Sequence, residues 1–200
     1  MSISPNTPAH AETSVGDTMA AVRPAEGLSQ NARYAPTSRL IHWAVAALVL
    51  VVWPLGFVIE FVQNEAKTPF YFLHESFGFL ILWLMLVRVV VRMIRGTPPQ
   101  PPMPRWQKIT AESVHGLLYV ALFLQPIFGF LATNAFGFPL DWFGLVTVWS
   151  PVGKSETWAP IFMGVHVALG YAILILFVLH LGGVLHHHLL KRDATLYRMI

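Results

Sequence analysis

Four long apolar stretches dominate this 200-residue chain and limit what it can fold into. Three of them exceed the roughly 18 apolar residues that a helix needs to cross a bilayer. These three contain no Asp, Glu, Lys or Arg: Leu40–Ile59, Ser113–Leu140 and Trp158–Leu190. The fourth stretch, Phe70–Ile94, contains Glu75, Arg88 and Arg92, and we predict that it is a span that holds something polar.

The composition supports a lipid environment for these stretches. Hydrophobic residues make up 55% of the chain and charged residues only 12%, which is too few to cover a soluble globule of this size. We therefore predict an all-α fold, an integral membrane four-helix bundle formed by residues 34–200. Its spans are expected at about residues 38–61, 70–95, 109–133 and 159–189.

The N-terminal segment, residues 1–33, differs from the rest. It is rich in Ala, Ser, Thr and Pro and lacks the continuous apolar segment of a secretory signal. We predict that it is a disordered tail.

The basic residues indicate how the bundle is oriented. Nine of them lie at the end expected to hold both termini and the turn between the second and third spans: Arg33, Arg39, Arg92, Arg95, Arg105, Lys108, Lys191, Arg192 and Arg198. The opposite end carries Lys67 and Lys154. Since Lys and Arg stay on the cytoplasmic side, we predict that both termini are cytoplasmic. These residues flank spans and form no soluble basic face, so the expected partner is membrane lipid and no nucleic acid.

Prolines and aromatic residues set the expected boundaries. Five prolines between Pro98 and Pro104 cannot continue a helix, so the second span must end before them. The short aromatic segment Phe136–Trp149 follows the third span, and we expect it to lie along the outer surface.

Histidines are the residues that most clearly suggest chemistry. The chain has nine of them and no cysteine, which excludes disulfides, thiolate-bound iron–sulfur clusters and the attachment motif of c-type haem. Five fall well inside the apolar spans: His42, His74, His115, His166 and His180. Ionisable residues are costly in a membrane interior, so a function is expected of them. For any single one, the alternative is a neutral ring bonded to a backbone carbonyl.

The spacing of these histidines predicts two sites. His166 and His180 are 14 residues apart, which places them on one face of a helix and about 21 Å apart along its axis. In an alternating bundle, His42 lies at the inner level with His180. His74 then lies at the outer level with His166. Two cross-helix pairs, one above the other, are therefore predicted.

Paired imidazoles favour haem over a bare metal ion. Structural zinc takes about four protein ligands, whereas haem brings four nitrogens of its own and needs two axial ligands. Two axial histidines leave no position for oxygen, which indicates electron transfer. The alternative from another class is a metal or proton transporter, which would be expected to show an inverted internal repeat.

Other residues are predicted to line these sites. Glycines allow close backbone approach to a porphyrin, and four stand at 14 or four residues after a span histidine: Gly56, Gly78, Gly129 and Gly170. Simple helix packing is their alternative. Arg88 is expected to pair with a haem propionate, unless it extends to the inner interface instead. His115 is expected to contact a propionate or a quinone, although it could compete as an axial ligand.

Four segments carry a resemblance to a known family: SRLIHWAVAALVL, HESFGFLILWLMLVRVVVR, HGLLYVALFLQPIFGFL and HVALGYAILILFVLHLGGVLHHHLLKRDATLYRM. Over residues 34–200 the chain resembles the bacterial cytochrome b561 family. The resemblance implies two b haems in a bundle of the bacterial inner membrane and electron exchange with ubiquinone. It also implies that the haem irons are bound by four histidines: His42, His74, His166 and His180.

The resemblance extends to members that oxidise superoxide and reduce ubiquinone, and there it implies an oxidoreductase with His187 at the quinone. The alternative for His187 is an interfacial histidine in the cluster His186–His188. The outer side, however, carries two basic residues against five acidic ones: Glu60, Glu65, Glu75, Asp141 and Glu156. That balance does not favour attraction of the superoxide anion. The alternative within electron transfer is the membrane-anchor subunit of a dehydrogenase or hydrogenase, with a soluble redox partner protein.

Overall fold

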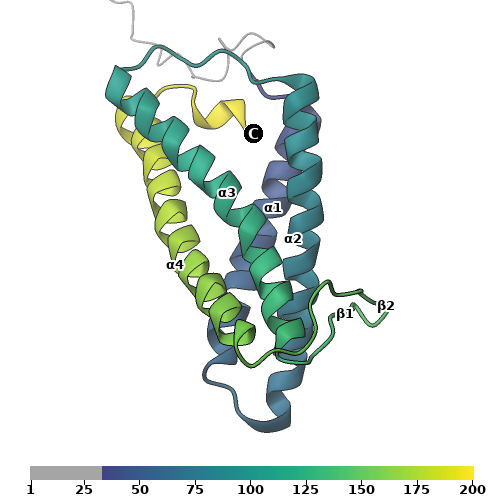
Figure 1. Cartoon of the computed structure of the whole chain (residues 1–200). Coiled ribbons are helices and arrows are strands. Elements are labelled where there is room, and N and C mark those ends of the chain that lie inside the picture. The colour runs from purple at the N-terminus through teal and green to yellow at the C-terminus, as the bar shows by residue number, and fades with distance from the viewer. Residues whose placement is uncertain (1–32) are drawn as a thin grey trace, which may run out of the picture.

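Four long helices lie side by side in the computed structural model, which describes residues 33–200 (Figure 1). Their bounds are α1 (Pro36–Ile59), α2 (Thr68–Arg95), α3 (Arg105–Ala135) and α4 (Trp158–Leu185). All four are long and apolar enough to cross a membrane. The predicted helical membrane bundle is thus confirmed. The predicted tail lies outside the described residues, apart from Arg33.

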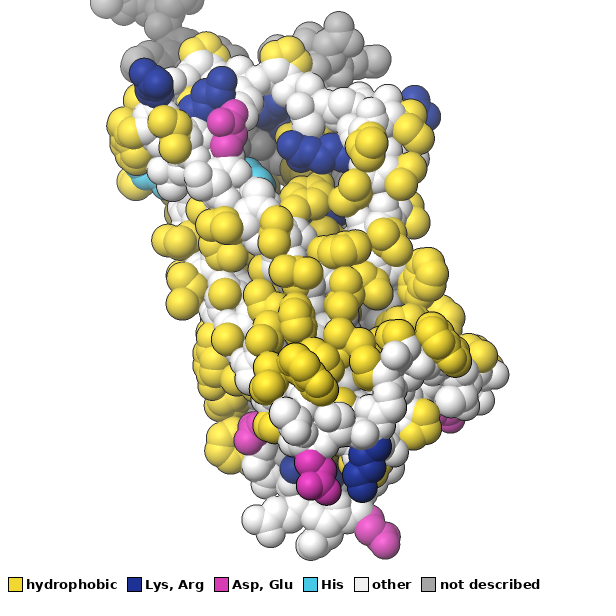
Figure 2. Space-filling model, in the orientation of Figure 1, with side chains coloured by type: hydrophobic (Ala, Val, Ile, Leu, Met, Phe, Trp, Pro, Cys, Tyr) yellow, Lys and Arg dark blue, Asp and Glu magenta, His cyan; other side chains and the backbone are white. Residues whose placement is uncertain are grey.

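The two ends of the bundle differ in charge. At one end, which we call the basic end, lie the start of α1, the α2–α3 connection and residues 186–200 (Figure 1). Lys and Arg side chains gather there, a hydrophobic band covers the middle, and Asp and Glu are more frequent at the opposite end (Figure 2). The orientation in the membrane stays a prediction from this distribution: the basic end faces the cytoplasm.

Proline and glycine determine where the helices begin and end. A proline stands in the first turn of both α1 and α2, where its fixed φ suits a helix and its missing N–H is not needed. α2 ends at Arg95 and is followed by Gly96, whose φ of +68° is readily adopted by glycine. The prolines that follow keep the connection to α3 extended, as the sequence predicts.

The helices pack mainly in two pairs, α1 with α2 and α3 with α4. The buried core is small and is formed by Val45, Val52, Ile81 and Met85. Most of the large apolar side chains on the helices are exposed instead. An exposed apolar surface of this extent is stable against lipid chains and not against water.

A small hairpin departs from the predicted all-α fold. Strands β1 (Asp141–Trp142) and β2 (Val146–Thr147) pair antiparallel at the end opposite the basic end, which we call the hairpin end. Phe143 and Gly144 both have positive φ values, +52° and +68°, and the Leu145 N–H donates to the Trp142 carbonyl at 3.0 Å, so these two residues are the centre of a tight β-turn. The segment predicted to lie along the surface therefore folds back on itself. Phenylalanine is rare at such a position, which is why the sequence pattern did not indicate the turn.

The hairpin is attached to α2 at one buried serine. The indole Nε1 of Trp142 donates to the carbonyl oxygen of Ser76 at 3.1 Å. The backbone N–H of Phe143 donates to the Ser76 hydroxyl, also at 3.1 Å. Ser76 itself is fully buried. This residue therefore fixes the hairpin beside the outer histidine level.

The last residues of the chain close the basic end. Short turns η3 (His186–Lys191, a π-helix) and η4 (Leu196–Arg198) follow α4. Arg198 is buried and donates to the carbonyl oxygens of Pro98 and Pro99 in the α2–α3 connection. Trp43 of α1 donates to the Met199 carbonyl at 2.8 Å. The C-terminus thus links α1, the α2–α3 connection and α4.

Removing the Ser76 hydroxyl should loosen the hairpin without disturbing the bundle. Ser76→Ala leaves the Phe143 N–H without its acceptor, so we expect a loss of about 1 kcal/mol in the free energy of unfolding. Faster limited proteolysis between residues 136 and 150 should accompany it. The control is Ser113→Ala on an exposed position of α3. Equal proteolysis rates in both variants would contradict the assignment.

Candidate functional site

The structure brings the span histidines together at two levels of the bundle. His74 of α2 and His166 of α4 have ring centroids 6.0 Å apart, with planes at 84°. His42 of α1 and His180 of α4 are 6.2 Å apart, at 73°. These are the two pairs that the spacing predicts. His74 and His166 lie toward the hairpin end, and His42 and His180 toward the basic end.

The rings of the hairpin-end pair are oriented by backbone carbonyls. His74 Nδ1 lies 2.9 Å from the Val52 carbonyl oxygen, and His166 Nδ1 lies 2.9 Å from that of Gln125. A carbonyl only accepts, so each Nδ1 carries the proton and donates it. Each neutral ring therefore keeps a lone pair on Nε2, the nitrogen that can bind a metal.

Two glycines make these ring positions sterically available. A Cβ on Gly56 would lie 2.6 Å from His74 Cε1, and one on Gly129 would lie 2.8 Å from His166 Cε1. In both cases the accepting carbonyl belongs to the residue four positions before the glycine. Each imidazole thus lies against the helix at a position where the glycine has no side chain. A larger residue at either position would displace the ring.

The other two predicted glycines lie elsewhere. A Cβ on Gly78 would first meet Val52, at 3.9 Å, and one on Gly170 would meet the Gln125 amide at 3.4 Å. Neither distance requires the neighbour to move much. The structure does not bring Gly78 or Gly170 against a histidine ring.

Positive charge surrounds the basic-end pair. Arg88 Nε donates to the Tyr119 hydroxyl at 2.9 Å, and the guanidinium groups of Arg88 and Arg92 lie 5.2 and 5.3 Å from the Tyr119 ring centroid. Arg88 Nη1 is buried and finds no hydrogen-bond partner among residues 33–200. His115 lies close by, with its ring 5.1 Å from that of His180. A buried, unpaired guanidinium nitrogen calls for an anion.

These observations fit a haem better than a bare metal ion. If both imidazoles of a pair bound one metal ion, each through a bond of about 2 Å, their ring centroids would lie roughly 6 Å apart. Both observed pairs have this separation. Within residues 33–200, no three His, Cys, Asp or Glu residues cluster to hold a metal ion by themselves. A porphyrin has four nitrogens of its own, and its propionates would supply an anion for the partnerless Arg88 Nη1.

Gln125 is a site residue that the sequence interpretation missed. Besides its carbonyl, its side-chain amide lies 3.4 Å from His166 Nε2, a contact that a metal bound there would replace. Its Oε1 is buried without a partner in the described part of the chain. The signal available was a lone amide inside an apolar span, directly before Pro126. Glu75 is satisfied locally, since it accepts from the Thr133 hydroxyl at 3.1 Å.

His187 lies apart from both pairs. It follows α4 in η3, and its ring contacts Asp193, Thr195 and His186 rather than any of the paired histidines. The structure therefore places it at the basic end, beyond His180.

Comparison with known proteins adds an independent finding. A sequence model described as prokaryotic cytochrome b561 matches residues 33–200. Cytochrome b561 homolog 2 of Escherichia coli K12 is 31% identical over 175 residues, which cover 84% of this chain and 91% of that protein. Cytochrome b562 of Cereibacter sphaeroides is 28% identical and covers 86% and 98%. A probable superoxide oxidase of Yersinia pestis is 29% identical and covers 80% and 91%.

The glycine contacts can be tested directly. Gly56→Ala or Gly129→Ala should displace a ring of the hairpin-end pair and lower the haem content of the purified protein. Gly78→Ala is the matched control, because its Cβ meets nothing closer than 3.9 Å. The measurement is pyridine haemochrome absorbance per mole of chain. Full haem content in both test variants would show that the rings tolerate the methyl group.

Proposed function

The chain belongs to the prokaryotic cytochrome b561 family, and on that premise we propose that it is a di-haem b cytochrome that exchanges electrons with ubiquinone in the bacterial inner membrane. Haem b binding and electron transfer within the membrane follow from the family. The number of haems, the quinone and the cellular membrane are our proposals.

The observation that carries the proposal is the presence of two cross-helix histidine pairs in one bundle. His74 and His166 would hold one haem, and His42 and His180 the other. When bound, each haem supplies one-electron transfer. Because the two levels are roughly 21 Å apart along α4, the pairs connect the two ends of the bundle.

The protein's own groups determine how such cofactors would behave. The carbonyls of Val52 and Gln125 hold the hairpin-end rings in one tautomer and make each Nε2 a stronger donor. Two imidazoles per site leave no open position for oxygen, which supports electron transfer over oxygen chemistry. Arg88 and His115 are positioned to bind propionates at the basic-end site, where Arg88 Nη1 lacks a partner.

We propose superoxide as the electron donor at the hairpin end, which is a more specific proposal than electron transfer alone. It is supported by the printed name of the Yersinia pestis relative. The local charge gives it no support, because the two lysines there are outnumbered by acidic residues. Of the two lysines, Lys154 packs the carbon chain of its side chain against Gly137. Direct measurement of superoxide consumption is therefore required.

The proposal is tested on the full chain purified in detergent. We expect low-spin b-type spectra in the oxidised and dithionite-reduced states and two haems per chain by pyridine haemochrome. Alanine at any of the four paired histidines should remove about one haem. His186→Ala is the control, since His186 is exposed and its ring lies against that of His187 rather than against a paired histidine. A protein that stays colourless when reconstituted with haem would overturn the proposal.

Arg88 should influence the potential of the basic-end haem. A buried positive charge stabilises the reduced, more negative state, so Arg88→Leu should lower that midpoint potential. We expect a shift on the order of 60 mV, a tenfold change for a one-electron couple. Spectroelectrochemical titration measures it, with the exposed Arg95→Leu as the control. An unchanged potential would place the Arg88 guanidinium away from this site.

A further inference from the structure

We propose that the β1–β2 hairpin inserts one apolar face into the lipid of the leaflet at the hairpin end, while its other face meets water. The partner of this exposed apolar surface is thus phospholipid, and neither a second copy of the chain nor a soluble protein. Such an insertion is independent of the number of haems and of the proposed quinone and superoxide chemistry.

The hairpin exposes large apolar side chains. Leu145, in its turn, is 83% exposed and Val146 is 51% exposed, and Phe138 and Trp149 on either side of the hairpin are exposed as well. Asp141 is the only charged residue between residues 136 and 149. Hydrophobic side chains of the projecting part adjoin the hydrophobic band of the bundle (Figure 2). A continuous apolar surface of this kind marks a contact with lipid or with protein.

The pairing of the two strands gives the hairpin one polar and one apolar face. In the antiparallel register, Asp141 is opposite Thr147 and Trp142 is opposite Val146. Opposed residues project from the same face of a hairpin, and successive residues project from opposite faces. Asp141 and Thr147 therefore share one face, and Trp142 and Val146 share the other.

Contacts with α2 show which face is directed toward the middle of the membrane. The hairpin backbone is bonded to Ser76, which lies roughly 12 Å along α2 from its first residue, Thr68. The Trp142 ring lies 5.8 Å from the ring of Phe79, which lies roughly 16 Å along the same helix. Trp142 thus extends from the hairpin toward the middle of α2. Since Val146 is on the same face, it is directed the same way.

The attachment point lies within the apolar part of the membrane. α2 has 28 residues and is roughly 42 Å long, whereas the hydrocarbon core of a bilayer is about 30 Å thick. A helix centred in this core has roughly 6 Å outside it at each end, so Ser76 is roughly 6 Å inside. The connection between α1 and α2 extends farther along the bundle axis than the hairpin does (Figure 1). The hairpin therefore lies at the edge of the hydrocarbon and not in the water beyond it.

Backbone polar groups at that depth need hydrogen-bond partners within the protein. The hairpin provides them beyond the paired residues of β1 and β2. The N–H of Leu145 donates to the Trp142 carbonyl, and the N–H of Val148 donates to the Leu140 carbonyl at 2.8 Å. This internal bonding allows a non-helical segment to enter the boundary of the lipid.

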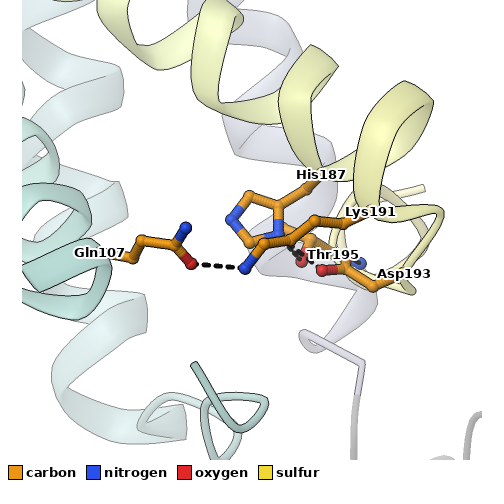
Figure 3. A network of polar contacts seen from close by, with 5 residues as sticks. All are labelled: Gln107, His187, Lys191, Asp193 and Thr195. Atoms are coloured by element: carbon orange, nitrogen blue, oxygen red, sulfur yellow. Dashed lines mark hydrogen bonds and ion pairs between the residues drawn. The ribbon is translucent and has the colours of Figure 1, made fainter. Parts of the chain in front are cut away.

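The segment that closes the basic end shows how a different kind of surface is held. There Lys191 donates to Gln107 of α3, and His187 is bonded to Asp193 (Figure 3). The hairpin is held instead by aromatic ring contacts and by the buried Ser76. A surface that binds a soluble protein has a polar rim around its apolar centre. With one charged residue, the hairpin does not supply such a rim, which favours lipid as its partner.

A fluorescent probe at single cysteines tests the insertion, because the chain has no cysteine of its own. Val146→Cys and Thr147→Cys form a matched pair, since they are adjacent and lie on opposite faces. Each is labelled with bimane in the full chain in nanodiscs. Quenching by brominated phosphatidylcholine measures contact with lipid, and quenching by iodide measures contact with water. The ratio of lipid to iodide quenching should be about fivefold higher at residue 146 than at residue 147, because alternate residues of a strand face opposite sides.

Two reference positions calibrate the ratio. Val120→Cys, on the exposed middle of α3, gives the value for lipid, and Glu65→Cys, in η2 (Asn64–Lys67), gives the value for water. Leu145→Cys should approach the value of Val120→Cys. Should the label at residue 146 unfold the hairpin, which faster proteolysis between residues 136 and 150 would reveal, Leu145→Cys decides.

The outcomes distinguish lipid from the other partners. Ratios at residues 145 and 146 equal to that of Glu65→Cys would place the hairpin in water and overturn the proposal. Protection of both positions from both quenchers would also overturn it, and would indicate a second copy of the chain or another protein on this face. An equally high ratio at residue 147 would contradict the two-faced arrangement. A high ratio at residues 145 and 146 with a low ratio at residue 147 is the result expected for insertion.

Discussion

The contact of two imidazole rings with two helix glycines is the interaction on which the rest of the bundle depends. Inside a bilayer no water is available to hydrogen-bond a polar group, so each ring needs a hydrogen-bond partner within the protein. His74 and His166 find theirs in the carbonyls of Val52 and Gln125. They can reach them because Gly56 and Gly129 leave the turn open. The same contacts bring α2 onto α1 and α4 onto α3.

This contact is repeated almost unchanged in the two halves of the bundle. In α1 and α3 a glycine follows a span histidine by 14 residues, and the ring that rests on it comes from the next helix of the same half. The basic-end level breaks the correspondence, because the position in α2 that matches His180 is Arg88. One level thus has two equivalent histidine rings, each oriented by a backbone carbonyl. The other level has two histidine rings together with the Arg88 guanidinium and a third imidazole, that of His115, which gives it a more positive environment.

The polar ends complete the structure by different means. At the hairpin end, the buried Ser76 holds a tight turn against α2. At the basic end, the C-terminal residues close over the bundle through Arg198 and Met199. His187 and Asp193 belong to this closing segment. The segment that covers the basic end therefore also carries the His187 ring, which is hydrogen-bonded to Asp193.

The sequence by itself determined the spans and the level of each span histidine, because both follow from helical rise and from the cost of placing polar groups in lipid. It also singled out Gly56 and Gly129 by their spacing from His42 and His115, but as residues expected to lie against a porphyrin rather than against an imidazole. Only the tertiary structure decided which ring rests on which glycine, that Gly78 and Gly170 face other side chains, and that Gln125 reaches His166. It alone showed the hairpin, since its turn places Phe143 at a left-handed position that sequence patterns assign to Asn, Asp or Gly. The pairing of His187 with Asp193 was likewise hidden, because it depends on a π-helical turn and a left-handed Arg192. The hydrophobic periodicity of the sequence indicates regular helix only. The hairpin and the His187–Asp193 pair lie where the regular helices have ended.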